Sequence, residues 1–155
     1  MKLDHKMKKF LEKNLMENVK ELMDTLPIND EFDAIILATL ITQYTEVDIF
    51  NLFSGTAELD DIPKFGINEI ARLVKKHMAY KTAINHTQKL IKEGYLIDIN
   101  QLIIEKIEEI TPIITNNDKI LYKITLTLVG EELESLIEKY EKTKRMLIVN
   151  FEKIA

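Results

Sequence analysis

Apolar residues recur at three- and four-residue steps at the start of the chain, which is the period of a helix. This stripe consists of Leu3, Met7, Leu11, Leu15, Val19, Leu22 and Leu26. Pro27 follows directly, and the residue before a proline is driven out of helical geometry. The pattern predicts one long helix over residues 1–26. Its apolar side needs a partner surface, because it would otherwise lie exposed to water.

Two further helices are predicted in the first half of the chain. The first covers Glu31–Gln43, with Asp30 as its N-cap and apolar residues on nearly every side. Such a helix is typical of the centre of a core. The second is shorter and lies around Val47–Phe53, and loop-like residues follow it up to Pro63.

Two short helices and a strand are predicted next. The first helix begins at Gly66 or Asn68 and ends near Lys76, and the second covers Lys81–Glu93. Gly94 occupies the position of a C-terminal glycine cap. The apolar run that follows, residues 95–99, predicts a strand.

The last third of the chain predicts a returning strand and a final helix. Residues 120–128 alternate between apolar and other side chains, and Asn116, Asn117 and Asp118 before them have turn chemistry, so we expect a hairpin. Residues 101–110 fit either a helix or a strand, and their β-branched content favours the strand. From Gly130 onward a helical stripe predicts a helix to the end. It comprises Leu133, Leu136, Ile137, Tyr140, Leu147, Phe151 and Ile154.

The predicted elements follow the order of a winged helix-turn-helix. This order is two short helices with a tight break between them, a glycine, and then a strand, a turn and a second strand. We therefore predict a single domain over residues 1–155, mostly α with a small antiparallel β wing. The winged-helix core covers residues 30–129, and helices 1–26 and 130–155 serve dimerisation. The combined apolar stripes of these helices would exceed the few hundred Å² that soluble monomers usually expose, so we expect a homodimer.

Composition narrows the function classes. The chain has 155 residues and no cysteine, which excludes disulfides and thiolate metal sites. Its most apolar stretch, Ala34–Ile41, is far shorter than the ~18 residues of a membrane span, and the start lacks a secretory signal, so we expect a cytoplasmic protein. His5, His77 and His86 form no metal-ligand pattern, and no phosphate loop or nucleophile motif occurs. We expect no enzyme, no metal and no cofactor.

The charge is distributed unevenly along the chain. The net charge is −5, yet residues 66–94 contain six Lys or Arg and two Glu, a local charge of +4. Residues 30–63 contain eight acids and no Lys or Arg. A basic patch on an acidic body can bind phosphates, because counterion release depends on nearby charge.

The predicted helix 81–93 has the two faces that a recognition helix needs. Ala83, Ile84, Thr87, Leu90 and Ile91 form its inward face, and polar or basic residues form the other. Asn and Gln can pair bidentately with adenine and Lys can reach guanine acceptors, while flanking lysines position the protein on phosphates. The predicted DNA-binding residues are Lys75, Lys76, Tyr80, Lys81, Thr82, Asn85, His86, Gln88, Lys89, Lys92 and Lys119.

The chain resembles the MarR family of winged helix-turn-helix regulators. The likeness covers Ile70-Ala71, the run Leu90-Ile91-Lys92-Glu93-Gly94-Tyr95-Leu96, and residues 124–133, which look like the junction between wing and last helix. It implies a dimer formed by the terminal helices, a pseudo-palindromic double-stranded DNA site and a small apolar effector. The turn here offers Asp118 and Lys119 where the family's wing tip usually has Asp and Arg.

Two other functions fit the same pattern. The predicted wing region, residues 95–129, contains three Lys and five acids, a charge of −2. Together with the acidic residues 30–63, it favours a winged-helix module that binds proteins and not DNA. A plasmid or viral replication or copy-control protein would share the DNA contact without the regulatory role.

Overall fold

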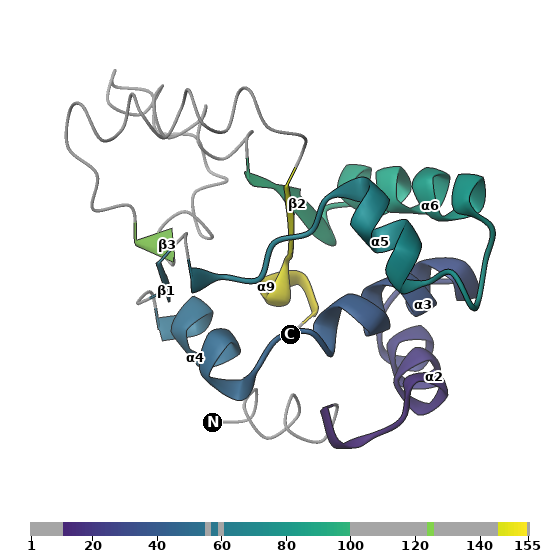
Figure 1. Cartoon of the computed structure of the whole chain (residues 1–155). Helices are drawn as coiled ribbons and strands as arrows, with labels where there is room; N and C mark the ends of the chain where they lie inside the picture. Colours follow the sequence, from purple (N-terminus) through teal and green to yellow (C-terminus); the bar gives the residue numbers. More distant parts are fainter. Residues whose placement is uncertain (1–10, 55–56, 59–60, 100–123, 126–145, 155) are drawn as a thin grey trace.

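The computed structural model describes residues 11–54, 57–58, 61–99, 124–125 and 146–154 (Figure 1). This part of the chain is mostly helical and contains a small two-stranded antiparallel sheet. The helices are α2 (Leu15–Thr25), α3 (Glu31–Ile41), α4 (Glu46–Ser54), α5 (Ile67–Leu73), α6 (Tyr80–Lys92) and α9 (Phe151–Ile154). The strands are β1 (Ala57–Glu58), β2 (Leu96–Asp98), β3 (Ile124–Thr125) and β4 (Leu147–Val149).

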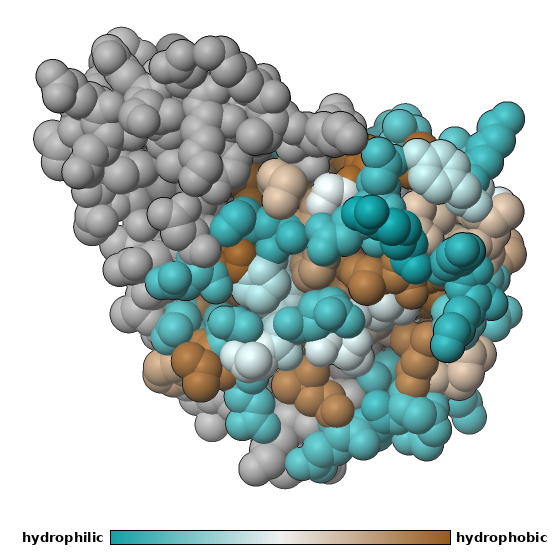
Figure 2. Space-filling model, viewed as in Figure 1, coloured by the Kyte–Doolittle hydropathy of each residue, from teal (hydrophilic) through white to brown (hydrophobic). Residues whose placement is uncertain are grey.

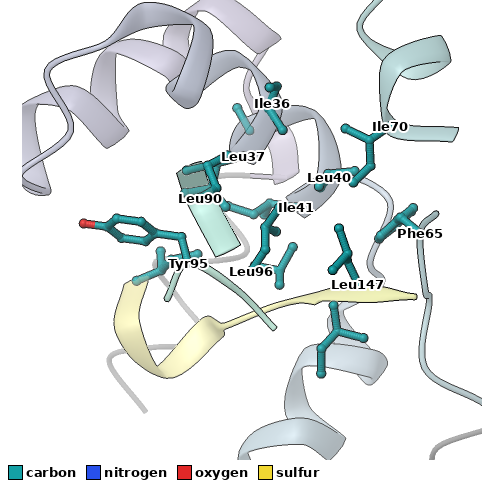
Figure 3. Close-up of a cluster of buried hydrophobic side chains, with 14 of the residues drawn as sticks. Ile36, Leu37, Leu40, Ile41, Phe65, Ile70, Leu90, Tyr95, Leu96 and Leu147 are labelled. Carbon is teal, nitrogen blue, oxygen red and sulfur yellow. The ribbon is translucent and has the colours of Figure 1, made fainter. Parts of the chain in front are cut away.

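Helix α3 is the centre of the core, as its all-round apolar sequence predicted. Asp30 caps it by accepting a hydrogen bond from the backbone nitrogen of Phe32 (2.8 Å). From Ala34 to Ile41 only Thr39 is not buried. Figure 3 shows its aliphatic side chains among residues from α5, α6, β2 and β4. The buried set includes Ile36, Leu37, Leu40, Ile41, Phe65, Ile70, Leu90, Tyr95, Leu96 and Leu147.

The predicted helix over residues 1–26 is not continuous. Residues 11 and 12 are helical, but the chain leaves the helix before α2 begins at Leu15. The cause is Asn14, whose side chain accepts a hydrogen bond from the backbone nitrogen of Glu17 (2.9 Å) as an N-cap. Val19 and Leu22 of α2 belong to the core around α3, so part of the apolar stripe is covered within the chain. Residues 1–10 lie outside the described part.

The two short helices predicted before Gly94 are confirmed as α5 and α6, and Gly94 follows the end of α6 as predicted. Gly94 has a φ of 84°, a conformation that glycine adopts without strain. The backbone nitrogen of Tyr95 donates to the oxygen of Leu90 (3.0 Å), and that of Gly94 donates to Ile91 (3.1 Å). These two bonds form a Schellman motif, which stops α6 and turns the chain into β2.

The partner of β2 differs from our expectation. We expected residues 120–128 to return beside it, but β2 pairs antiparallel with β4, with Leu96 opposite Val149. The described part of the predicted strand, β3, pairs in parallel with β1. Phe65 forms a bridge to the other edge of β4 through Leu147. The turn at residues 116–118 and the ambiguous residues 101–110 lie outside the described part.

Strand β4 also corrects the predicted helix over residues 130–155. Leu147, Ile148 and Val149 are all buried, whereas a helix with one apolar stripe would expose some of them. A short, continuous apolar run suits a strand that is covered on both faces. Only Phe151–Ile154, the short helix α9, are helical among residues 146–154, and residues 130–145 lie outside the described part.

The structure also bears on the remaining helices. The apolar helix expected around Val47–Phe53 is confirmed as α4. Among the described residues, no helix combines the length and the apolar character that crossing a bilayer would need.

Candidate nucleic-acid interface

Helix α6 has three parallel stripes of different character. Ala83, Thr87 and Leu90 follow one another at helical steps and are buried. Ile84 and Ile91 beside them are half-buried, so the inward face predicted from the sequence is confirmed. This apolar side packs on α3 and α5 and holds α6 in a definite orientation.

The outer stripe consists of Lys81, Asn85, Gln88 and Lys92, all exposed. Their spacing of four, three and four residues places them in one row along the helix. At a rise of 1.5 Å per residue the row is ~16 Å long. The row therefore offers two amides between two cations on a rigid surface, the kind of groups that read base edges and contact phosphates.

The end of α5 and the turn that leads into α6 carry further exposed cations. Lys75 and Lys76 are exposed, and so is Arg72 in the last turn of α5, which we had not predicted as a site residue. Tyr80 is exposed and its hydroxyl donates to Oδ1 of Asn68 (2.5 Å). Figure 2 shows hydrophilic side chains standing out over α5 and α6, with apolar ones between them.

Most of these cations have no acidic partner in the described part of the chain. No ion pair within 4 Å joins the side chains of Arg72, Lys75, Lys76, Lys81 and Lys92 to an acid in residues 11–54, 57–58, 61–99, 124–125 or 146–154. Within that part of the chain these five cations are exposed, as the binding of an external anion would require. Thr82 is half-buried, and Lys119 lies outside the described residues.

Two predicted DNA-binding residues have an internal partner instead. His86 and Lys89 form a third stripe of α6, beside the first turn of α3. Nδ1 of His86 lies 2.6 Å from Oδ1 of Asp33, and Nζ of Lys89 lies 2.7 Å from Oδ2 of the same carboxylate. Asp33 is only 2% exposed. Sequence reasoning treated both residues as free because the α3 acid is far away along the chain.

Lys89 keeps its charge in this setting. The hydrogen bond to Asp33 raises the pKa of Lys89 above its ordinary value, and the smaller effect of desolvation acts in the opposite direction. A cation is therefore present beside the carboxylate throughout the neutral pH range. The pair joins α6 to α3 electrostatically, next to the apolar packing that already holds the two helices together.

Within the described part of the chain, the same corner contains three side chains whose ligand atoms are close enough together to hold a metal ion. Ligand atoms of Asp30, Asp33 and His86 lie within 4.8 Å of one another. Lys89 contacts the Asp33 carboxylate and neutralises it, so a divalent cation would have to displace an ammonium group. No histidine spacing in the sequence could have indicated this cluster, because His86 is 53 residues from Asp33.

No protein-family model, curated protein or solved structure matches the chain. The resemblance to the MarR family, with its apolar effector, therefore stays a prediction from the motifs quoted above.

Proposed function

We propose that the chain is a sequence-specific regulator that binds double-stranded DNA through a winged helix-turn-helix, with α6 as the recognition helix. One observation carries the proposal: Lys81, Asn85, Gln88 and Lys92 form an exposed row, while the opposite side of the same helix is anchored in the core. A major groove admits a helix of this kind, and amides and lysines are the groups that read its edges.

The order of the elements supports this proposal. Helices α5 and α6 are followed by Gly94 and β2, and β4 lies antiparallel to β2. This is the order of a winged helix-turn-helix if residues 100–146 connect the two strands. The wing would then be longer than the one predicted from the sequence, which ended at residue 129.

The charges support the same surface. Arg72 in the last turn of α5 and Lys75 and Lys76 in the turn that leads into α6 are exposed, and none has an ion-pair partner among the described residues. Cations in such positions neutralise backbone phosphates and hold the helix in register with the groove.

We further propose that the regulator is a homodimer. A two-fold axis would place two copies of α6 in successive major grooves, ~34 Å apart. Met16 of α2 is 51% exposed and is one apolar group available to a second subunit. Sedimentation at micromolar concentration tests this part: a dimer is expected, and a monodisperse monomer would contradict it.

The direct test is selection of bound fragments from random duplex DNA, followed by sequencing. We expect an inverted repeat whose half-sites are one helical turn apart. Binding of the selected duplex is then measured by fluorescence anisotropy between 50 and 200 mM KCl, and the affinity should fall steeply with salt. Absence of an enriched site together with salt-independent binding would refute the proposal.

One observation favours a protein-binding module instead. Val47 and Phe50 on α4 are 66% and 48% exposed, and they lie among the acids of a segment without Lys or Arg. This reading predicts capture of one stoichiometric protein partner, loss of that capture in Phe50→Lys, and no shift of duplex DNA at low salt. Retention of the partner by Phe50→Lys would count against it.

A further inference from the structure

The Asp33 carboxylate lies at the junction of α3 and α6 and uses both of its oxygens on residues of α6. Oδ1 is 2.6 Å from Nδ1 of His86, and Oδ2 is 2.7 Å from Nζ of Lys89. Asp33 is in the first turn of α3, where a negative charge also interacts favourably with the helix dipole.

The burial of the three groups is unequal. The side chain of Asp33 is 3% exposed, that of His86 is 19% exposed and that of Lys89 is 45% exposed. A carboxylate that is removed from water is costly unless it is paired. If Lys89 turned toward a DNA phosphate, Asp33 would lose its cationic partner while still buried. Moving Lys89 away from Asp33 therefore costs more free energy than moving a surface lysine that has no buried partner.

We propose that Asp33 is a positioning residue of the DNA-binding surface: it retains Lys89 on α3, so that Lys89 contributes no phosphate contact. This inference rests on the proposed function. It corrects the expectation from the sequence that Lys89 contacts phosphate. Under this proposal, the number of α6 cations that contact DNA phosphates depends on Asp33 of α3.

The salt dependence of DNA binding measures the number of cations that contact phosphates. Each phosphate contact by a cation steepens the plot of log K against log[KCl] by about 0.9. Over a change from 50 to 200 mM KCl this corresponds to a factor of about 3.5 in affinity.

Four proteins are compared on the selected duplex: the wild type, Asp33→Asn, Lys89→Met and the double variant. We expect Lys89→Met to leave the slope unchanged and Asp33→Asn to steepen it by about 0.9 for each subunit, or about 1.8 for the proposed homodimer, because the amide no longer holds the ammonium. The double variant should return to the wild-type slope. Lys81→Met is the matched control, an exposed lysine of the same helix without an acidic partner among the described residues. It should make the slope shallower by about 0.9 for each subunit, or about 1.8 for the homodimer.

A structural role alone would weaken binding in Asp33→Asn without steepening the slope, so that result would overturn the proposal. A shallower slope in Lys89→Met would also overturn it, and this variant decides the matter even if Asp33→Asn does not fold. A wild type whose binding does not depend on salt would instead refute the proposed function, so the two failures are distinguishable.

Discussion

The hydroxyl of Tyr44 joins two parts of the chain that are far apart in sequence. It donates to the carbonyl oxygen of Pro63 (2.8 Å) and accepts from the backbone nitrogen of Val149 in β4 (3.1 Å). Its ring also makes edge contacts with Phe65 and Phe151. Tyr44 thereby connects the end of α3 to the segment before α5 and to the strand that completes the antiparallel sheet.

Removal of this hydroxyl should destabilise the fold. Tyr44→Phe keeps the ring but leaves the Pro63 oxygen and the Val149 nitrogen without this partner, so we expect a loss of about 1–3 kcal/mol in the free energy of unfolding. Urea denaturation measures it. Tyr80→Phe is the control. Its hydroxyl donates to Asn68, both side chains are exposed, and the effect should stay within about 0.5 kcal/mol. Equal stabilities of the two variants would contradict the role given to Tyr44.

Tyr44 also predicts a dependence of stability on alkaline pH. Burial raises the pKa of Tyr44 above its ordinary value of 10.0, with a smaller opposite effect of the hydrogen bond from Val149. Above pH 10 the unfolded chain loses the phenolic proton while the folded chain keeps it. The unfolded state then binds fewer protons, so stability falls as the pH rises. The stability difference between the wild type and Tyr44→Phe should therefore shrink from pH 9 to pH 11, and a constant difference would contradict this.

Gly94 should be sensitive to substitution for a backbone reason. A Cβ at this position would lie 3.4 Å from Nζ of Lys153, which is an ordinary contact, but φ is +84°. Gly94→Ala should cost about 1–2 kcal/mol, because L-residues are strained in this conformation. Gly94→Asn should cost less, since Asn tolerates the left-handed region. Thermal unfolding compares the two variants, and a larger loss for Asn would show that steric contact dominates.

Thr87 predicts a stabilising substitution. It is fully buried in α6, and among the described residues no hydrogen-bond partner is found for its hydroxyl. Thr87→Val replaces the hydroxyl with a methyl group of similar shape, so we expect a gain of about 1 kcal/mol. Thr39→Val in α3 is the matched control, because the Thr39 hydroxyl donates to the Ile35 carbonyl (2.7 Å), and it should give no such gain. Destabilisation by Thr87→Val in urea would show that this hydroxyl has a partner.

The amides of the α6 row should carry sequence discrimination. Asn85→Ala or Gln88→Ala should lose about 1–3 kcal/mol of preference at defined base pairs, as expected for a bidentate contact. Lys75→Ala should instead weaken binding to all duplexes, since phosphate contacts position the protein without specifying sequence. Competition binding with single-base substitutions in the selected site measures both effects. Uniform weakening by all three variants would remove the base-reading role of the amides.

The sequence by itself determined the elements whose signals are local. The caps at Asp30 and Gly94, the all-round apolar character of α3 and the two faces of α6 are each encoded within a few consecutive residues. Hydrophobic periodicity reports such features directly, because burial of one side follows from the spacing of apolar residues. The exposed row from Lys81 to Lys92 was predictable for the same reason.

Only the tertiary structure decided which distant segments meet. Periodicity shows that a segment needs a partner but does not identify it, so the pairing of β2 with Leu147–Val149 was missed in favour of residues 120–128. The apolar stripe predicted a helix that continues through Asn14, but Asn14 caps the start of α2 instead. Which of the two forms cannot be read from the stripe, because an Asn side chain can bond to nearby backbone and so compete with a helix. Asp33, His86 and Lys89 meet because α3 and α6 pack together, and their charges interact across a distance in sequence that no local pattern records.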